Sequence, residues 1–509
     1  MTIPRWLRRI GLGLLGLGLL IALFYAEEDW RGAREWARVK KELQARGEPL
    51  QFPEMPPVPD DQNVAAAPIF AEYFSAMASD NSERIHNTAF WKIRVFIHQP
   101  GVMRPTLGAV GSKEEFDVVR WQKYFTGKEN SMTAATDILA ALQPYDQTIR
   151  EVRQALDRPA IRWSQSLLDP IFSNRFPQLE AALDVASFLP IRALAEIEAG
   201  QSDAAIDDLE LQLRLSASLN SNPVLLCHMV SVSIDKLSYV IVIRGLEKRV
   251  WNDVQLRRVE SVLAERNPLT DFQKAMKGER VFFLEEMTSV IKNPGKWINY
   301  QQGLEYPRSF WGRIEGSFFT LIPTGWLDFN QAYYCKGIES DFIDPIHPEE
   351  GRVDLALVTS SFAKENSREH GLARSSVYSF FWRLVMPSLH ASLSRAAYDQ
   401  AILNAARTAC ALEDYRLQNG HLPATLDALV PTFLPALPPD PVADGPLHYV
   451  PSGDDDYLLY SIGWNGKDDG GVIARKPGST APDLDNGDWV WASRPSLYRF
   501  VESPPKAGS

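Results

Sequence analysis

The sequence predicts a mainly α-helical protein. We expect a single N-terminal transmembrane helix, an α-helical array of hairpin repeats, and a small C-terminal α+β module with a long helix and a short antiparallel sheet. Three observations predict this architecture. Residues 10–26 form an uncharged apolar run. Residues 62–300 carry apolar side chains at helical spacing. Residues 388–419 carry an apolar side chain at every seventh position, and two strand-like segments follow.

Length and composition bound the class of protein. A chain of 509 residues exceeds the size of one hydrophobic core, which rarely grows past about 250–300 residues, so we expect several domains. The net charge is −11 and there is no long basic run, which argues against nucleic-acid binding and against broad adhesion to anionic lipid. Cys227, Cys335 and Cys410 form no CxxC pair. We interpret them as small buried side chains, although one disulfide stays open in an oxidising compartment.

Residues 1–26 have the layout of a membrane anchor. The run Ile10–Ala26 would rise about 25 Å as a helix, at the short end of what spans a bilayer. Three arginines precede it and three acidic residues follow it, which predicts a cytoplasmic N-terminus with the bulk in the periplasm or cell envelope of a bacterial-type cell. A cleaved signal peptide has the same layout, but residues 23–25 are too bulky for a cleavage site, so an anchor is preferred.

Residues 27–61 are expected to join the anchor to the body. Residues 27–47 are highly charged, and their apolar side chains recur near the helical period, which predicts a short juxtamembrane helix ended by Gly47. Five prolines stand between positions 49 and 59. Proline blocks helix and favours extended geometry, so this segment is predicted to be a stiff spacer.

The clearest unit of the array lies at residues 186–219. Gly200 is placed to break the chain between two helices, and Ser202 is placed to cap the second. This unit resembles a tetratricopeptide-type hairpin, although the 34-residue pattern of that family is not repeated along the chain. In an array of such helices, neighbouring helices bury each other's apolar faces. The array would serve as a scaffold or interaction surface.

Two further helices are expected in the array. The segment from Pro223 to Arg244 contains His228, Asp235 and Lys236, so we predict a core helix rather than a second membrane span. Asn252 is placed to cap the next helix. Residues 301–385 are less regular and rich in aromatic and turn residues, which predicts a connecting region whose aromatics form core or interface more often than a ligand groove.

Residues 386–509 predict the α+β module. Its helix would begin near Ser388, run about 45 Å and end at Asn419-Gly420. A proline-punctuated loop follows. Residues 446–451 and 456–462 are strand candidates, separated by Ser-Gly-Asp-Asp.

The order of motifs over about residues 388–495 resembles the major pseudopilin of type II secretion systems. The matching segments are LEDYRLQNGHLPATLDALV, Asp440-Pro441, YLLYSIGWNGKDDGG, and Asp488 before Trp489-Val490. In that family, the glycine-rich acidic loop and the later aspartate enclose a calcium ion. The resemblance therefore implies a calcium site in this chain.

Carried over by position, the implied calcium ligands are Ser461 through its carbonyl, Asn465, Asp468, Asp469 and Asp488. Calcium prefers several oxygen ligands, and glycines let a short loop fold around the ion. The asparagine stands where the family usually has aspartate, and the lost charge should weaken binding. The alternative is a solvated acidic turn without metal.

The chain differs from the pseudopilin family in its membrane helix. A pseudopilin carries its long helix at its own N-terminus with an early glutamate, whereas here the apolar run lacks that glutamate and lies more than 350 residues upstream. An ordinary pseudopilus subunit is therefore not implied, and the fold is expected to be reused as a C-terminal cap. The whole arrangement is similar to that of large membrane-anchored bacterial envelope proteins, which implies no activity.

The sequence contains no catalytic signature of the GxSxG, HExxH, phosphate-loop or dinucleotide-binding kind, and the glycines at positions 11–18 are interpreted as membrane-helix residues. His347 with Glu349 and Glu350 could ligate a metal, and His370 beside Glu369 could act as a base. A lone histidine near acids is more often a surface residue.

Three functions stay open. We expect a non-enzymatic, membrane-anchored extracytoplasmic scaffold or interaction protein, with another protein as its partner. An extracytoplasmic hydrolase with a site between the helical region and residues 300–385 is the first alternative, and converging histidines or carboxylates in a deep pocket would favour it. An accessory component of a secretion or pilus-like apparatus is the second, and it rests on fold analogy.

Overall fold

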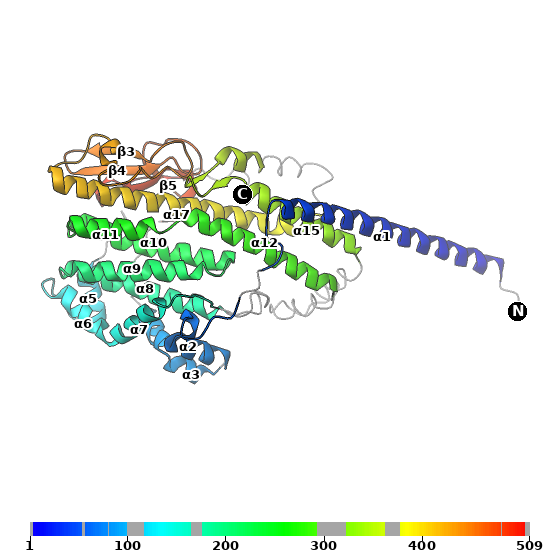
Figure 1. Cartoon of the computed structure of the whole chain (residues 1–509), viewed down its shortest axis with the longest axis horizontal. Coiled ribbons are helices and arrows are strands. Elements are labelled where there is room, and N and C mark those ends of the chain that lie inside the picture. The colour runs from blue at the N-terminus through cyan, green and yellow to red at the C-terminus, as the bar shows by residue number, and fades with distance from the viewer. Residues whose placement is uncertain are drawn as a thin grey trace.

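The computed structural model describes residues 4–52, 56–79, 81–98, 117–163, 176–292, 322–361, 377–479 and 481–503. The mainly helical class is confirmed (Figure 1). The N-terminal helices are α1 (Arg5–Ala45), α2 (Pro68–Ala78), α3 (Ser82–Asn87), α4 (Ala89–Ile97), α5 (Val118–Thr126), α6 (Ala134–Leu142) and α7 (Asp146–Leu156). The later helices are α8 (Pro177–Glu198), α9 (Ser202–Leu219), α10 (Leu225–Lys248), α11 (Asp253–Ala264), α12 (Pro268–Lys292), α15 (Thr324–Ile338) and α17 (Phe380–Asn419).

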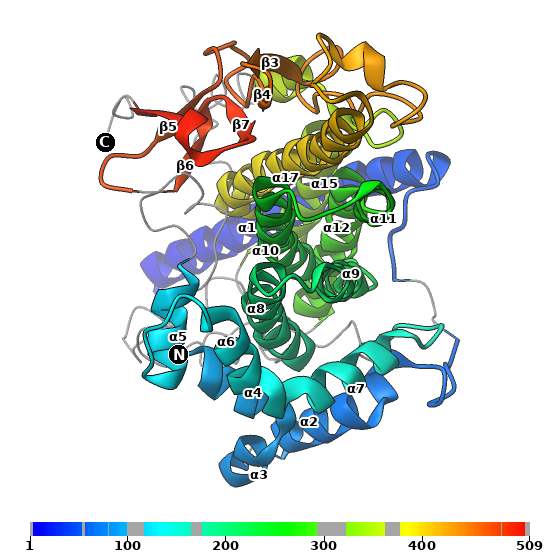
Figure 2. The same ribbon diagram turned by 90° about the vertical axis from the view of Figure 1, so that its left-hand side faces the viewer.

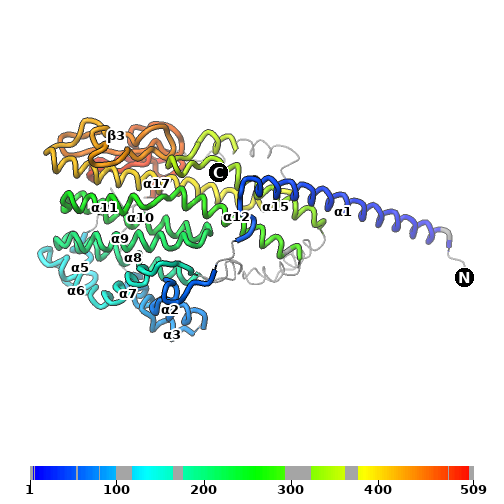
Figure 3. Tube along the Cα trace, viewed as in Figure 1, coloured from blue at the N-terminus to red at the C-terminus, as the bar shows by residue number. Residues whose placement is uncertain are grey.

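The predicted anchor and the predicted juxtamembrane helix form one continuous helix, α1. Its first half projects from the body (Figure 3). The leucines of this half are exposed. Among the described residues, α1 and α10 are long and apolar enough to cross a membrane by length and composition. The apolar stretch of α10 is mostly buried in the body, as expected of a core helix, whereas that of α1 is not.

The helices of the body stack in layers (Figure 2). Helices α2–α7 pack on α8 and α9, and this part has its own core around Phe70, Phe90 and Phe188. A larger core begins at α9 and α10 and continues through α11, α12 and α15 to α17. The β-sheets cover the outer side of α17.

The local signals at the helix ends are mostly confirmed. Gly200 adopts a φ of +74° and separates α8 from α9 in a tightly packed hairpin. Asn252 caps α11 in a reciprocal capping box with Gln255. The capping role predicted for Ser202 is wrong. This residue is already the first helical residue of α9, and its hydroxyl donates instead to the carbonyl of Val250 at 3.3 Å. The repeat character of the array stays a prediction.

Helix α17 begins at Phe380 rather than near Ser388, and it includes Pro387. Phe381 and Trp382, which precede the predicted start, are buried. Their packing in the core extends the helix to residues before the apolar stripe that predicted it. The helix ends at Asn419 as predicted, with Gly420 at a φ of +79°.

The region predicted to be irregular contains helix α15, a π-helical turn at Glu339–Ile343 and a short hairpin, β1 (Ile346–His347) with β2 (Arg352–Val353). Four of its aromatics, at positions 310, 311, 318 and 319, lie outside the described residues.

The C-terminal module contains two three-stranded sheets rather than one. The first is antiparallel and has the order β3 (His448–Ser452), β4 (Asp456–Ser461), β7 (Trp489–Ala492), so the two predicted strands are confirmed. The second has the order β6 (Pro482–Gly487), β5 (Val472–Arg475), β8 (Arg499–Glu502) and is mixed, because β8 runs parallel to β5.

The module shares its core with the helical array. One face of α17 packs on α10, α11 and α12, and another packs on the sheet through Leu459, Trp489 and Trp491. The three cysteines are free and buried, as interpreted from the sequence.

Candidate functional site

The acidic loop of the predicted calcium site folds around Asp488. One oxygen of this buried carboxylate accepts the backbone N–H of Asp469 at 3.2 Å, and the other accepts that of Gly471 at 2.6 Å. Burial raises the pKa of Asp488, although these amide hydrogen bonds oppose the shift. The sequence-predicted aspartate therefore does meet the loop, and it holds the loop closed through backbone amides.

The other predicted ligands make hydrogen bonds of their own. The side-chain amide of Asn465 donates to Asp469 Oδ2 at 2.9 Å. Asp468 Oδ1 accepts from the Tyr460 hydroxyl at 3.2 Å and from a backbone amide of the loop at 2.9 Å. Ser461 lies apart from them, and its hydroxyl donates to Asp440 Oδ1 at 2.7 Å.

These residues do not fit a preformed calcium cage. Calcium needs six to eight oxygens directed at one centre. Here the oxygens of Asp488 and Asp468 face N–H and O–H donors instead. In the part of the chain that the structure describes, no group of three or more His, Cys, Asp or Glu side chains is placed to hold a metal ion.

Asp440 is a structural residue to which the sequence reasoning assigned no role. It is completely buried, and its carboxylate accepts the Ser461 hydroxyl and the backbone amides of Val442 at 3.0 Å and Ile462 at 3.2 Å. Burial raises the pKa of Asp440, although these hydrogen bonds act to lower it. The sequence signal was the Asp440-Pro441 pair among the segments that resemble the major pseudopilin.

The catalytic alternative depended on His347 and its acidic neighbours. His347 lies in β1 and is partly exposed, and Glu349 and Glu350 are exposed on the turn that follows. The side chain of Asn267, at the start of α12, bonds the carbonyl of Pro348 in this turn at 3.1 Å. This hairpin is therefore packed as a surface turn. His370 and Glu369 lie outside the described residues.

His228, Asp235 and Lys236 of α10 all pack within the body. Asp235 pairs with Arg266 at 2.9 Å, and the ammonium of Lys236 lies 5.3 Å from the ring centre of Tyr398 on α17. Burial, together with Arg266, lowers the pKa of His228 to about 3. The imidazole is consequently neutral at physiological pH and does not serve as an acid there.

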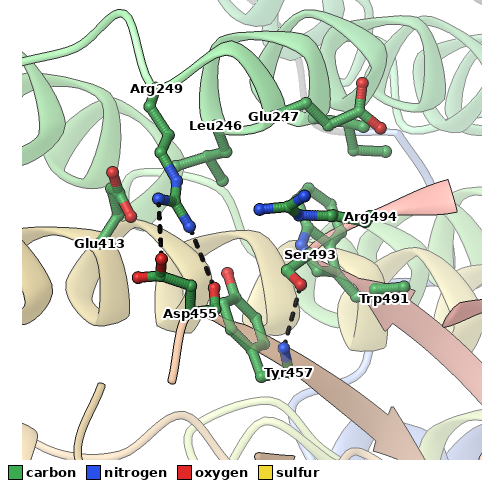
Figure 4. A pocket seen from close by; sticks show the side chains of 11 residues that line it. Leu246, Glu247, Arg249, Glu413, Asp455, Tyr457, Trp491, Ser493 and Arg494 are labelled. Carbon is green, nitrogen blue, oxygen red and sulfur yellow. Dashed lines mark hydrogen bonds and ion pairs between the residues drawn. The ribbon is translucent and has the colours of Figure 1, made fainter. Parts of the chain in front are cut away.

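A small pocket opens where the end of α10 meets α17 and the first sheet (Figure 4). Its volume is about 20 Å³, which leaves room for about one water molecule or the tip of a side chain. Enzyme pockets for small substrates are far larger, about 300–1,000 Å³. Its lining includes the acids Glu247, Glu413 and Asp455, the arginines Arg249 and Arg494, and the aromatics Tyr457 and Trp491.

Arg249 has unusual backbone geometry in this pocket. Its φ is +51°, and no other non-glycine residue among those described has a positive φ. Such a conformation is costly for a side chain with a Cβ, and here it ends α10 as a left-handed C-cap. The guanidinium reaches Asp455, bonding its carbonyl at 3.1 Å and approaching its carboxylate at 3.4 Å (Figure 4).

The other charges of the pocket are also paired. Glu413 binds Arg416 at 2.6 Å, and Arg494 binds Asp456 at 2.7 Å. The carboxylates and guanidinium groups of the pocket are thus already engaged with one another or with neighbouring charges. The pocket is suited to receiving a polar side chain.

No protein-family model, curated protein or solved structure matches this chain. The resemblance of residues 388–495 to the major pseudopilin accordingly stays a prediction. Function has to be inferred from the geometry of the molecule itself.

The junction between α1 and the body is a second functional feature. The buried carboxylate of Glu28 accepts the indole N–H of Trp326 at 2.8 Å and the hydroxyl of Tyr378 at 2.7 Å. Asp29 accepts the backbone N–H of Gly325 at 2.8 Å. The sequence identified these acids only as flanks of the apolar run. An acid followed four residues later by glycine was the sole signal for a tight helix contact.

The far end of α1 is fastened by a buried arginine. Arg280 of α12 is completely buried and pairs with Glu48 at 2.6 Å and with Glu339 of the π-helical turn. Lys277 also pairs with Glu48, at 2.9 Å. Helix α1 is thus held to the body at both ends of its second half.

Proposed function

We propose that this protein is a non-enzymatic, membrane-anchored scaffold of the bacterial cell envelope. In this proposal α1 crosses the bilayer, the N-terminus is cytoplasmic, and the body lies outside the cytoplasm. The observation that carries it is the division of α1 into two halves. The first half is apolar and exposed, whereas Glu28, Asp29 and Gly32 lock the second half to α15.

The shape of the body supports a role in presenting a surface away from the membrane. Tyr378, two residues before α17, binds Glu28 where α1 leaves the body. Glu413 in the pocket lies 33 residues after Phe380 along the same helix, which is about 50 Å at 1.5 Å per residue. The pocket is therefore at the end of α17 opposite to the anchor (Figure 1).

The pocket supports a protein partner rather than a small substrate. It has the volume of a side-chain tip, and it is lined by both carboxylates and guanidinium groups. In the proposal, one polar side chain of the partner enters beside Arg249, and the surrounding surface of α10, α17 and the sheet supplies the remaining contact. Aromatic and arginine side chains in such positions often dominate binding energy.

Arg249→Gly tests this role while keeping the backbone conformation. Glycine adopts the positive φ at no steric cost, so the backbone is kept while the guanidinium is lost. The full chain is retrieved from envelope extracts in detergent as the wild type, as Arg249→Gly, and as Arg214→Ala. Arg214 is the control because its exposed pair with Asp157 lies away from the pocket.

We expect one protein to be retained equally by the wild type and the control, and at least tenfold less by Arg249→Gly. Equal retention by all three would contradict the binding role of the pocket. If no protein is retained above background, the scaffold function is wrong. A hydrolytic activity of the purified chain that survives these substitutions would have the same consequence.

A further inference from the structure

We propose that the end of the body from which α1 emerges docks on the bilayer surface through an aromatic collar. The collar consists of Trp30, Trp326, Tyr378, Phe380 and Leu384. The inference rests on the proposed membrane anchoring by α1, and it adds that the body itself contacts lipid. The occupant of this surface is the interfacial region of the membrane.

The depth of the collar follows from one ring contact. The ring of Phe24, in the last turn of the apolar run, lies 6.4 Å from the ring of Trp326 on α15. The ring of Tyr378 lies 6.3 Å from that of Trp326. If Phe24 is at the edge of the hydrocarbon, these two rings of the body are at the same level. Tryptophan and tyrosine are enriched at that boundary because they are apolar with one polar end.

The polar ends of both rings point in the direction this arrangement requires. The indole N–H of Trp326 and the hydroxyl of Tyr378 both donate to Glu28. Glu28 lies one helical turn beyond Phe24, on the water side of the apolar run. The Trp326 ring therefore has its apolar part beside Phe24, the Tyr378 ring packs on Trp326, and the polar atoms of both are directed to Glu28 on the aqueous side.

Two large apolar side chains extend the collar onto α17. Phe380 is 51% exposed and Leu384 is 67% exposed, and they lie one turn apart at the start of the helix. They lie two and six residues after Tyr378, which is hydrogen-bonded to Glu28. Single exposed apolar residues are common, but an adjoining pair beside a membrane-spanning segment forms a patch that lipid would cover.

Helix α1 fixes the position of the collar relative to the bilayer. Trp30 is 62% exposed one turn beyond Ala26, and the guanidinium of Arg34 lies 5.5 Å from its ring centre. A cation stacked on an exposed indole suits the headgroup layer, where phosphates are available. Because Gly32 and Gly325 bring α1 against α15 without intervening side chains, α1 and the collar move as one body.

Fluorescence quenching in membranes tests the collar. The full chain is reconstituted into vesicles of phosphatidylcholine and phosphatidylglycerol, with an environment-sensitive dye on one introduced cysteine. The three native cysteines are buried, so they are protected from labelling in the folded protein. The positions are Phe380→Cys and Leu384→Cys in the collar, Leu15→Cys in the apolar run and Val254→Cys as the control. Val254 is 69% exposed at the start of α11, near the far end of the body.

We expect spin-labelled lipid to quench the dye at least twofold at positions 15, 380 and 384, and to leave position 254 unchanged. Quenching at position 15 without quenching at 380 and 384 would overturn the docking while leaving the anchor in place. No quenching at position 15 would overturn the anchor, and the docking with it. Because both collar positions are exposed, neither substitution removes a core side chain.

Discussion

Gly32 of α1 and Gly325 of α15 meet so closely that a Cβ atom on Gly32 would lie 2.2 Å from the carbonyl oxygen of Gly325. Farther along, Arg46 pairs with Glu339 at 3.3 Å, so the two helices run side by side in the same direction. Only glycine permits this approach of two backbones. The contact converts an apolar helix that could have swung freely into a rigid extension of the body.

Gly32→Ala should separate the two helices. The added methyl group must displace backbone rather than a flexible side chain, so we expect a loss of about 1–3 kcal/mol in the free energy of unfolding. Urea denaturation of the full chain in detergent measures this loss. Gly16→Ala is the control, because a Cβ atom there meets nothing within 4 Å. Equal stability of the two variants would contradict the close contact.

Arg280→Met should leave the buried carboxylates of Glu48 and Glu339 with only the more exposed cations Lys277 and Arg46, at a cost of about 3–5 kcal/mol. Burial favours a raised pKa for Glu48, but hydrogen bonds from Arg280 and Lys277 lower it below the usual 4.5. The stability that this carboxylate contributes is therefore present above about pH 4.5 and is lost as the pH falls through the lower folded value.

Chemical denaturation between neutral and acidic pH measures both effects. The wild type should lose more stability on acidification than Arg280→Met does. Arg214→Met, which breaks an exposed pair, should cost only about 0–1 kcal/mol. A cost as small for Arg280→Met would show that the buried pairs do not fasten α1.

Glu196→Gln should stabilise the protein at alkaline pH. Burial in the α8–α9 hairpin, with repulsion from Asp208, raises the pKa of Glu196 to about 8, and Arg192 only partly opposes this. A carboxyl with a raised folded pKa contributes stability below its unfolded pKa, and that contribution is lost as the pH rises toward 8. Glutamine does not ionise and avoids this loss. The free energy of unfolding of the variant should therefore exceed that of the wild type by a few kcal/mol near pH 8.

The gain should vanish near pH 4.5, where the glutamate is protonated in the folded state. Glu265→Gln is the matched control, because Glu265 is exposed at the end of α11. Unfolding curves at several pH values distinguish the two. If the gain in stability were the same at every pH, it would not come from the ionisation of Glu196.

Asp488→Ala should destabilise the acidic loop whether or not calcium is present. The substitution removes the acceptor for two backbone amides, and hydrogen bonds to a charged group are worth about 1.5–3 kcal/mol each. Asp488→Asn keeps one carbonyl acceptor and should lose less. Thermal unfolding with calcium and with chelator should give the same melting temperature for the wild type. A rise with calcium that Asp488→Ala abolishes would establish the metal site instead.

The fragment 386–509 should not fold as a monomer. Leu393, Ala396 and Leu403 of α17 belong to the core shared with α10 and α11, and a fragment that begins at residue 386, inside α17, lacks those partner helices. We expect aggregation or loss of near-ultraviolet circular dichroism, whereas the full chain in detergent should keep both solubility and signal. Cooperative unfolding of a monomeric fragment would show that the module is an independent domain.

Several features could be predicted because their cause is local. Uncharged residues from Ile10 to Ala26 indicate an apolar helix in any surroundings. Gly200 and Gly420 end helices because they adopt positive φ, and Asn252 caps α11 through atoms three residues away. The pairing of β3 with β4 follows from a turn between two strand-forming segments.

The remaining features depend on groups far apart in the chain. Residues 461–488 carried the signature of a metal loop, but the direction of each carboxylate was decided by amides and hydroxyls that only folding brings near. The start of α17 at Phe380 was decided by burial against α12 and α15, which outweighs the local preference around Pro387.

By itself the sequence determined the class of the protein, the apolar helix, and most helix ends, since these depend on spacing and backbone preference within a few residues. Tertiary structure decided the rest. It placed Glu28 against Trp326 and Tyr378, which lie 298 and 350 residues later in the chain, and it joined the C-terminal module to the array through one core. The physical reason is that burial and hydrogen bonding act through space, so their partners have no fixed separation along the sequence.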